Sequence, residues 1–358
     1  MKFCNMTMLA LTLSATGIPA TLAHAQSASG NPGSGEAPRA SIEMPDLASR
    51  SIVDLAPKLD DSEASRDLSF PDGAEMERAF TTRSRSSDAT TAPSDELKKA
   101  IEGAMSGTSA PAAEKPGTTE DPAFAEESRQ VFGEDDRVQV TQTKAYPFNT
   151  IGQIWSMTKD GEWSICSGTL IGKRTVITAA HCLYNHDAGG WLADYEFYPG
   201  LNGQGNAPYG KYGFTDAHIL EGYISNYKGF YGSVVPWDLG ILILDAPAGE
   251  AVGWMGYSAY DPVYALRANI VGYPGDKPVS TMWATNCDID PGTASINNFT
   301  YLCDTYPGSS GSAVYEFNGD TKERHIIGIN IAETSSANVA LRLNVPYFRW
   351  VNGIASQN

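Results

Sequence analysis

The sequence predicts an all-β domain over residues 130–358, with antiparallel strands arranged as a sandwich or as barrels and a helix at its C-terminus. The composition changes abruptly near Val131, because all seven tryptophans and all seventeen tyrosines lie beyond that point. From there, short β-rich runs alternate with Gly, Pro, Asn and Asp, which is typical of antiparallel strands and turns. Residues 345–354 instead carry apolar side chains at helical spacing.

Residues 1–25 have the features of a secretory signal. Lys2 is followed by an apolar run, and the segment ends in small residues at Ala23 and Ala25. The run is too short to span a bilayer, and the small residues predict cleavage before Gln26. The protein is therefore expected to be secreted, to an extracellular or periplasmic location.

Residues 26–129 are rich in Ser, Ala, Pro, Thr, Glu and Asp, and contain no Trp or Tyr. This composition predicts a largely disordered segment that buries little of a core. One helix is expected over residues 94–105, which offer a Ser cap, an acidic first turn and helical apolar spacing. The segment is interpreted either as a linker or as a propeptide, and its place between an export signal and a compact domain favours a propeptide.

The expected strands of the domain are short, and turn-forming residues separate them. Such a pattern fits one domain of roughly 225 residues. The clearest runs lie at 151–157, 164–172, 174–180, 238–245, 268–273, 310–317 and 325–332.

The charge of the chain restricts its partners. The formal net charge is −17, which excludes a broad basic surface for nucleic acid or anionic lipid. We expect no nucleic-acid or membrane partner, no cofactor, and a monomer that meets protein or peptide substrates.

Four cysteines remain once Cys4 has left with the signal, and an even number in an oxidising compartment predicts two disulfides. Four cysteines allow three pairings, of which the two local pairs are the simplest. A zinc site is less favoured because neither pair has the spacing of metal ligands. We therefore predict no metal site, and assign the disulfides to Cys166, Cys182, Cys287 and Cys303.

His181 is the first candidate catalytic residue. It follows the apolar run of residues 174–180 and precedes Cys182. A disulfide at Cys182 would restrain the backbone of the histidine. The alternative is a structural histidine at a strand end.

Asp238 is the second candidate, because it directly precedes a run of apolar residues that predicts a buried strand. A carboxylate at that position needs a partner, since an unpaired buried charge is costly. A histidine N–H would satisfy it and would fix the tautomer that leaves the other ring nitrogen free to act as a base. An aspartate in a surface turn is the alternative, and Asp245 fits that description better.

Ser310 is the third candidate and lies among small residues, with Gly308 before it and Gly311 after it. Acyl transfer requires a nucleophile on a tight turn and two backbone N–H groups that face the developing oxyanion. Gly308 and Ser310 can supply those donors. A Gly-Ser run is a weak motif by itself, but here a predicted strand follows it.

Residues 131–358 resemble the trypsin-like serine proteases, and in particular their bacterial glutamyl-endopeptidase branch. The segments TAAHC, VGWMGYS, GYPGDK and DTYPGSSGSAV carry the resemblance, and the candidates occur in the order His, Asp, Ser. The resemblance implies two antiparallel six-stranded β-barrels of the chymotrypsin-like fold. It also implies peptide hydrolysis through an acyl-enzyme, with His181 as general base, Asp238 as its orienting carboxylate and Ser310 as nucleophile.

Two departures from that family concern activation and specificity. Ser309 precedes the nucleophile where animal trypsins have an aspartate, so activation by an ion pair with a new amino terminus is not available. Asn330 stands where the branch has the histidine associated with its glutamate preference. His325 lies on the opposite face of the same predicted strand.

The sequence does not decide whether the enzyme prefers a basic or an acidic substrate residue before the scissile bond. Asp304 falls where trypsins have the carboxylate that binds Lys or Arg, which favours a basic residue. Branch members that cut after acidic residues carry a similar segment. Asp304, Thr305 and Asn330 are the predicted substrate-binding residues, and maturation is expected after Arg129.

Two other functions remain as alternatives. A catalytically silent domain of the same fold would act as a binding module or adhesin. An esterase would act mainly on small esters.

Overall fold

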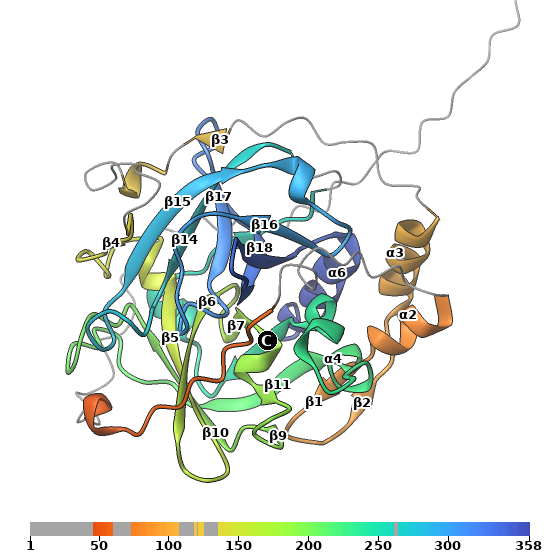
Figure 1. Cartoon of the computed structure of the whole chain (residues 1–358), viewed down its shortest axis with the longest axis horizontal. Helices are drawn as coiled ribbons and strands as arrows, with labels where there is room; N and C mark the ends of the chain where they lie inside the picture. Colours follow the sequence, from red (N-terminus) through yellow and green to blue (C-terminus); the bar gives the residue numbers. More distant parts are fainter. Residues whose placement is uncertain (1–45, 60–72, 107–117, 120, 125–134, 261–263) are drawn as a thin grey trace, which may run out of the picture.

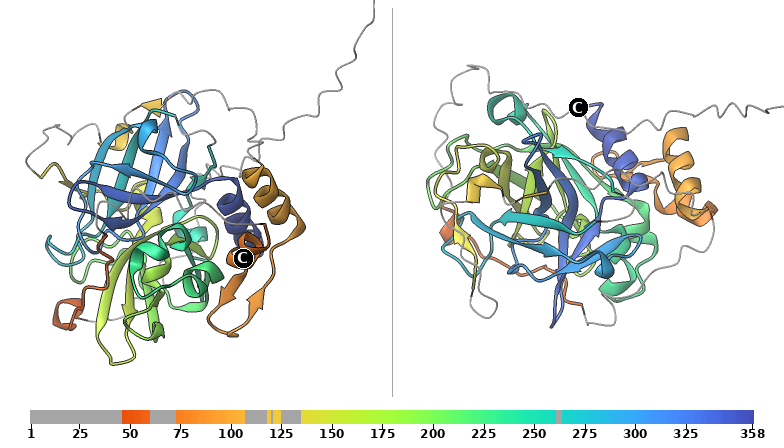
Figure 2. Two further views of the ribbon diagram at one scale, coloured as in Figure 1. Left: turned by 45° about the vertical axis from the view of Figure 1, so that its right-hand side comes forward. Right: turned by 90° about the horizontal axis from the view of Figure 1, so that it is seen from above.

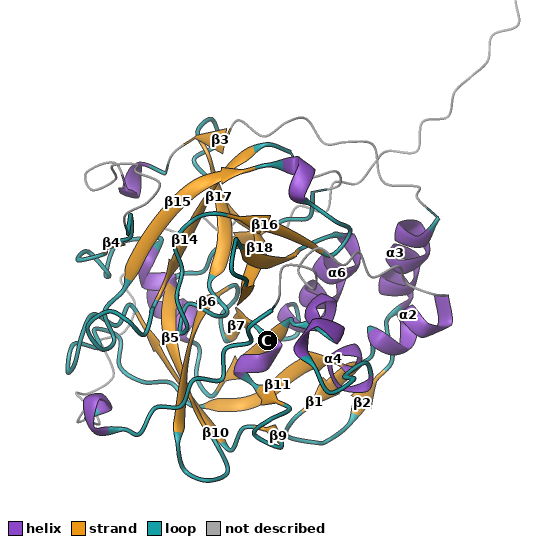
Figure 3. Ribbon diagram, viewed as in Figure 1, coloured by secondary structure: helices purple, strands orange, loops and turns teal. Residues whose placement is uncertain are grey.

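Two curved antiparallel sheets make up most of the molecule, and several helices gather on one side of them (Figures 1 and 3). The computed structural model describes residues 46–59, 73–106, 118–119, 121–124, 135–260 and 264–358. The expected signal at residues 1–25 and the maturation site after Arg129 lie outside the described residues.

The first sheet has eight strands. In order across the sheet they are β10 (Asp194–Pro199), β5 (Ile151–Met157), β6 (Trp163–Leu170), β7 (Thr175–Thr178), β12 (Gly240–Leu244), β11 (Phe214–Leu220), β1 (Thr82–Ser84) and β2 (Thr90–Thr91). All five residues of β12 are buried, which explains why this strand reads as an uninterrupted apolar run.

The second sheet has nine strands. Seven follow one path: β16 (Asn298–Tyr301), β19 (Asn338–Arg342), β18 (Arg324–Glu333), β17 (Ala313–Asn318), β14 (Leu266–Gly272), β15 (Trp283–Ile289) and β4 (Val138–Gln139). Two short strands join from the side, β13 (Gly256–Tyr257) on β18 and β3 (Thr118–Thr119) on β17. A separate small ribbon pairs β8 (Tyr184–Asn185) with β9 (Gly190–Trp191).

The predicted fold class is confirmed. Six strands of the first sheet come from residues 151–244 and six strands of the second from residues 266–342, and all of these pair antiparallel. The additional strands are short, and among the strands of the described residues only β13 pairs in parallel, beside two isolated parallel bridges, Ile52 to Trp163 and Lys58 to Glu333. The predicted C-terminal helix is α6 (Val345–Ala355). Asn344 caps its N-terminus, because the Asn344 side chain accepts a hydrogen bond from the N–H of Tyr347.

The remaining helices are short. The α-helices are α2 (Gly73–Ala79), α3 (Asp95–Met105), α4 (Glu221–Ser225) and α5 (Ala248–Val252). The 3₁₀ turns are η1 (Leu47–Ser49), η2 (Pro122–Phe124), η3 (Phe148–Thr150), η4 (Ala180–Cys182), η5 (Tyr231–Ser233), η6 (Val235–Trp237) and η7 (Pro291–Thr293). None of the helices in the described part of the chain has the length and apolarity needed to cross a membrane.

Residues 26–129, here called the leader, form helices and strands in the parts that the structure describes, which differs from the largely disordered segment that their composition predicts. The expected helix is present as α3, with the Ser94 hydroxyl accepting from the N–H of Leu97. Strand β1 pairs with β11 and so extends the first sheet, while α3 packs against α6 (Figure 2). Seven apolar leader residues are buried in the main core, namely Leu47, Leu59, Met76, Ala79, Phe80, Leu97 and Ile101.

The packing of Phe80 explains this difference. Its ring lies 5.6 Å from that of Trp237 and 5.0 Å from that of Tyr347, both of which belong to the domain. The leader has too few large apolar residues for a core of its own, but it buries those it has against an existing surface. The composition of the leader alone does not reveal this surface.

Candidate active site

The candidate base and its carboxylate lie at the same edge of the first sheet. His181 is in η4, just after β7, and Asp238 stands just before β12. β7 and β12 are antiparallel neighbours, with Thr178 paired to Gly240. Antiparallel pairing places the end of one strand beside the start of the other. The register of the sheet therefore brings the two side chains together.

Asp238 is fully buried and accepts three hydrogen bonds. Its Oδ2 lies 2.8 Å from Nδ1 of His181 and 2.7 Å from the hydroxyl of Tyr231. Its Oδ1 accepts from the backbone N–H of His181 at 2.9 Å. These donors compensate the cost of burying the carboxylate. They also favour the tautomer in which Nδ1 carries the proton and Nε2 is an acceptor.

The Nε2 atom of His181 is buried and has no hydrogen-bond partner among the described residues. The bond expected between this atom and the Ser310 hydroxyl is therefore not formed in this structure. Catalytic hydrogen bonds of this kind are often long before substrate binds and tighten afterwards.

Strand β6 holds the base and the nucleophile segment at adjacent positions. Cys166 forms a disulfide with Cys182, the neighbour of His181. The next residue, Ser167, donates its N–H to the carbonyl of Ser310 at 2.8 Å. That carbonyl oxygen also lies 3.7 Å from Sγ of Cys182. The backbone at Ser310 is thus docked next to the histidine turn. The second disulfide joins Cys287 to Cys303, so the structure contains the two local pairings.

Two glycines allow the backbone turn around Ser310. Gly308 has φ +104°, and a Cβ on it would lie 2.5 Å from the carbonyl oxygen of Tyr273. Gly311 has φ +82°, and a Cβ there would overlap the hydroxyl of Thr178. Neither position accepts a side chain without strain. Within the described residues the N–H groups of Gly308 and Ser310 donate no hydrogen bond, so both remain available to an oxyanion.

Tyr231 is a site residue that the sequence did not reveal. Its hydroxyl donates to Asp238, and it accepts in turn from Tyr223 at 3.0 Å. Burial, together with the nearby charge of Asp238, raises the pKa of Tyr231 well above its ordinary value. The hydroxyl therefore stays protonated and remains a donor. No fixed spacing in the sequence connects a tyrosine in this loop to the carboxylate.

Asn330 is held on both sides of its amide. Its Oδ1 accepts from Tyr301 at 2.6 Å, and its Nδ2 donates to the carbonyl of Ser309 at 3.2 Å. The side chain thus connects β18 to the nucleophile segment.

The other two predicted substrate-binding residues also have partners in the structure. Asp304 accepts the backbone N–H of Asp136 at 2.9 Å. Thr305 donates to Oε1 of Glu333 at 3.0 Å. Glu333 was not among the residues that the sequence suggested, although it stands only three positions after Asn330 at the end of β18.

A small cavity adjoins Ser310, between the domain and a part of the leader. It is enclosed by Ala56, Pro57, Lys58, Pro307, Ser310, Asn330, Ala332 and Glu333. The nucleophile segment and the end of β18 therefore form one wall of this cavity, and the leader forms the other.

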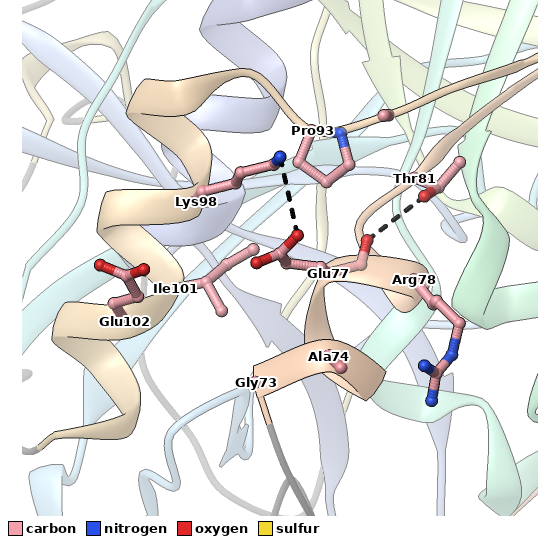
Figure 4. A pocket seen from close by; sticks show the side chains of 10 residues that line it. Gly73, Ala74, Glu77, Arg78, Thr81, Pro93, Lys98, Ile101 and Glu102 are labelled. Atoms are coloured by element: carbon pink, nitrogen blue, oxygen red, sulfur yellow. Dashed lines mark hydrogen bonds and ion pairs between the residues drawn. The ribbon is translucent and has the colours of Figure 1, made fainter.

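A wider hollow lies away from the triad, between α2 and α3 (Figure 4). Lys98 and Glu77 line this hollow, and their charged groups lie 3.8 Å apart. It contains no pairing of a nucleophile with a base, so we do not assign it to the chemistry.

One group of side chains in the described part of the chain has atoms close enough together to hold a metal ion. It consists of Cys166, His181 and Cys182. Both sulfur atoms are in the disulfide, so neither is a thiolate that could bind a metal.

Comparisons with known proteins point to a peptidase family. A family model described as "Trypsin-like peptidase domain" matches residues 166–323. A glutamyl endopeptidase of Bacillus licheniformis is 35% identical over 189 residues, which are 52% of this chain and 55% of that protein. A Bacillus subtilis protein named "Extracellular metalloprotease" is 31% identical over 231 residues, which are 63% of this chain and 70% of that protein.

A solved structure of a Glu endopeptidase in complex with MPD has a TM-score of 0.54 and 26% identity. The match covers 64% of this chain and all of that one. The chain spans about half the length of the Bacillus licheniformis relative.

Proposed function

Because the chain belongs to the trypsin-like serine peptidases, in their glutamyl-endopeptidase branch, we propose that it is a secreted serine endopeptidase that hydrolyses peptide bonds in protein substrates. The observation that carries the proposal is the buried contact between His181 and Asp238, with Nε2 left as an acceptor beside the docked Ser310 segment. The name of the Bacillus subtilis relative and the signal-like residues 1–25 support secretion.

The chemistry follows from these positions. His181 Nε2 removes the hydroxyl proton as Ser310 Oγ attacks the carbonyl carbon of the scissile bond. The N–H groups of Gly308 and Ser310 stabilise the resulting oxyanion, and Asp238 stabilises the imidazolium. The imidazolium then protonates the leaving amine, which gives an acyl-enzyme. Water, deprotonated by the same nitrogen, releases the acid and restores Ser310.

Two other functions compete with this one. A silent binding module would not need a buried Nε2 without a partner beside the docked Ser310 segment. A metal-dependent hydrolase would need ligands that the disulfide-bonded cysteines near His181 do not provide.

Labelling of the active serine tests the function. The secreted, processed protein is expected to react with a fluorophosphonate, with the modified peptide mapped by mass spectrometry to Ser310. EDTA should leave casein cleavage unchanged, because the mechanism uses no metal. Modification at another serine, or inhibition by EDTA that added metal reverses, would contradict the assignment.

We also propose that the protein is made as an inactive precursor, blocked by the leader strap, which we define as residues 50–59. The strap crosses the front of the molecule as the orange-red trace in Figure 1. At its start, Ser51 accepts from the N–H of Trp163, and Val53 donates to the carbonyl of the same residue, each at 2.8 Å. At its end, Leu59 donates to the carbonyl of Glu333 at 3.1 Å. The strap therefore connects the first sheet to the second.

The strap covers the nucleophile. Pro57 is buried, and with its neighbours it closes the small cavity that Ser310 lines. Between the two ends, the carbonyl of Leu55 accepts from the amide of Asn185 at 3.4 Å. A substrate cannot reach Ser310 along this path while the strap is in place.

Arg50 anchors the start of the strap. Its guanidinium lies 3.8 Å from the ring centroid of Trp163 and forms a 2.7 Å ion pair with Glu196. Burial acts to raise the pKa of Glu196, but hydrogen bonds from Arg50 and Lys211 hold that pKa below its ordinary value. Glu196 is therefore ionised and able to attract Arg50 at neutral pH.

Replacing Arg50 with alanine is expected to expose Ser310 in the unprocessed chain. The substitution removes a partly buried ion pair and the stacking on Trp163, which lowers the free energy of docking of the strap by about 1–2 kcal/mol. Fluorophosphonate labelling of the unprocessed band should therefore rise roughly tenfold. Gel separation of unprocessed and processed bands provides the measurement. Arg78→Ala removes an exposed leader arginine and should change nothing. Equal labelling rates of the wild-type unprocessed and processed bands would contradict the block.

A further inference from the structure

The cavity beside Ser310 contains a single charged side chain from the domain. Among the described residues, the domain contributes Pro307, Ser310, Asn330, Ala332 and Glu333 to its wall, and only Glu333 is charged. The cavity itself holds little more than a water molecule, because the leader fills its other side. Once the leader has left, a substrate side chain in its place meets a carboxylate next to Ser310.

The Glu333 carboxylate is held in place but not neutralised. Thr305 donates to its Oε1 at 3.0 Å, which leaves Oε2 to accept from a ligand. In the described part of the chain, no lysine or arginine forms an ion pair with it. Burial raises the pKa of Glu333, whereas the charges of Arg137 in the domain and of Lys58 on the strap act to lower it. A cation at this position therefore stabilises the ionised carboxylate.

The residues that the sequence suggested for this role are already engaged. Asp304 accepts from the backbone of Asp136 and lies next to the carboxyl of that residue. Burial and the charge of Asp304 raise the pKa of Asp136, so these two acids already share a crowded negative site. Asn330 uses both ends of its amide within the protein. Neither residue offers a free group comparable to Glu333 Oε2.

We propose that Glu333 is the specificity-determining residue of this peptidase and that it binds the lysine or arginine side chain preceding the bond to be cleaved. The proposal rests on the function proposed above, because it assigns the specificity of the same site. Ammonium and guanidinium groups donate strongly to a desolvated carboxylate. A glutamate or aspartate at the same place meets like charge, and the domain cation nearest in effect, Arg137, is already paired with Asp135 and Asp276, which selects against acidic substrates.

A set of fluorogenic peptides that differ only in the residue before the scissile bond tests the proposal. The secreted, processed wild type is expected to prefer Lys and Arg over Leu, and to cleave least after Glu. Glu333→Gln keeps the size and the Thr305 contact but removes the charge, and should lower kcat/KM for Lys and Arg by about 30-fold or more. Its kcat/KM for the Leu peptide should stay within about twofold, because that substrate makes no ion pair.

The pH dependence separates Glu333 from the catalytic histidine. The ammonium group of a lysine substrate binds the ionised carboxylate, and in the processed enzyme Thr305 and Arg137 of the domain still act on Glu333, whereas Asp54 and Lys58 have left with the leader. The Lys-to-Leu ratio of kcat/KM should therefore increase with pH in the wild type. In Glu333→Gln the ratio should be flat, since only the shared catalytic residues then titrate.

Two further variants and the labelling reaction distinguish a failure of the specificity proposal from a failure of the peptidase function. Asp320→Asn removes an exposed acid from the turn between β17 and β18, and should match the wild type. Asp304→Asn should keep the preference for Lys. The proposal is overturned if Asp304→Asn removes the preference for Lys and Arg while Glu333→Gln retains it. It is also overturned if the wild type, labelled by the fluorophosphonate, cleaves best after Glu. In both cases the peptidase function stands. A wild type that fluorophosphonate does not label rejects the function itself, and the specificity with it.

Discussion

Replacing Ser310 with alanine is expected to reduce kcat by about 10⁶-fold. In the proposed mechanism this hydroxyl forms the acyl-enzyme, so its removal leaves His181 without a nucleophile to activate. Ser310 is only 6% exposed and sits in a turn shaped by two glycines, so removal of one oxygen leaves the backbone unchanged. The measurement is steady-state cleavage of a peptide substrate, together with the thermal unfolding temperature.

A matched control is available next to Ser310. Ser309 shares the turn and is also buried, yet only its backbone appears among the hydrogen bonds of the site. Ser309→Ala should therefore keep kcat within about tenfold. Comparable losses in the two variants would mean that Ser310 is not the nucleophile.

Replacing Asp238 with asparagine should lower kcat by about 10⁴-fold. The asparagine can turn its NH₂ group toward Nδ1 of His181, which favours the tautomer with the proton on Nε2. That tautomer cannot accept the proton of Ser310. The substitution keeps the volume of the side chain, so the effect is measured as a lower kcat with a nearly unchanged KM.

Tyr231→Phe should lower kcat less than Asp238→Asn does. It removes one of the three hydrogen bonds that Asp238 accepts, but leaves both bonds from His181. A hydrogen bond to a charged group contributes about 1.5–3 kcal/mol, which corresponds to a loss of roughly 10- to 100-fold in kcat. A loss in Asp238→Asn no larger than that in Tyr231→Phe would contradict the orienting role of Asp238.

The leader shows most clearly where sequence reasoning had limits. Helix α3 was predictable from Ser94 and the apolar spacing that follows, because capping and periodicity are local properties. The pairing of β1 with β11 was not, since three residues carry no period and the partner lies far along the chain. The burial of Phe80 likewise depends on Trp237 and Tyr347, which only the fold brings close.

The residues of the candidate site also fall into those that the sequence predicted and those that only the structure revealed. His181, Asp238 and Ser310 could be found because each lies next to a strong local signal: a cysteine, an apolar strand or a pair of glycines. Tyr231 and Glu333 lie in a loop and at a strand end without any such signal. Their importance comes from what surrounds them, Asp238 in one case and Thr305 with the Ser310 cavity in the other.

The sequence by itself predicted seven strands of the domain, the C-terminal helix, the family and the candidate triad, because these depend on residue type and spacing over a few positions. Only the tertiary structure decided that the leader strap covers Ser310, that Tyr231 holds the carboxylate, and that Glu333 rather than Asp304 faces the cavity. The physical reason is that hydrogen bonding and burial depend on which distant segments lie within a few ångströms of one another, and this proximity is a property of the folded chain.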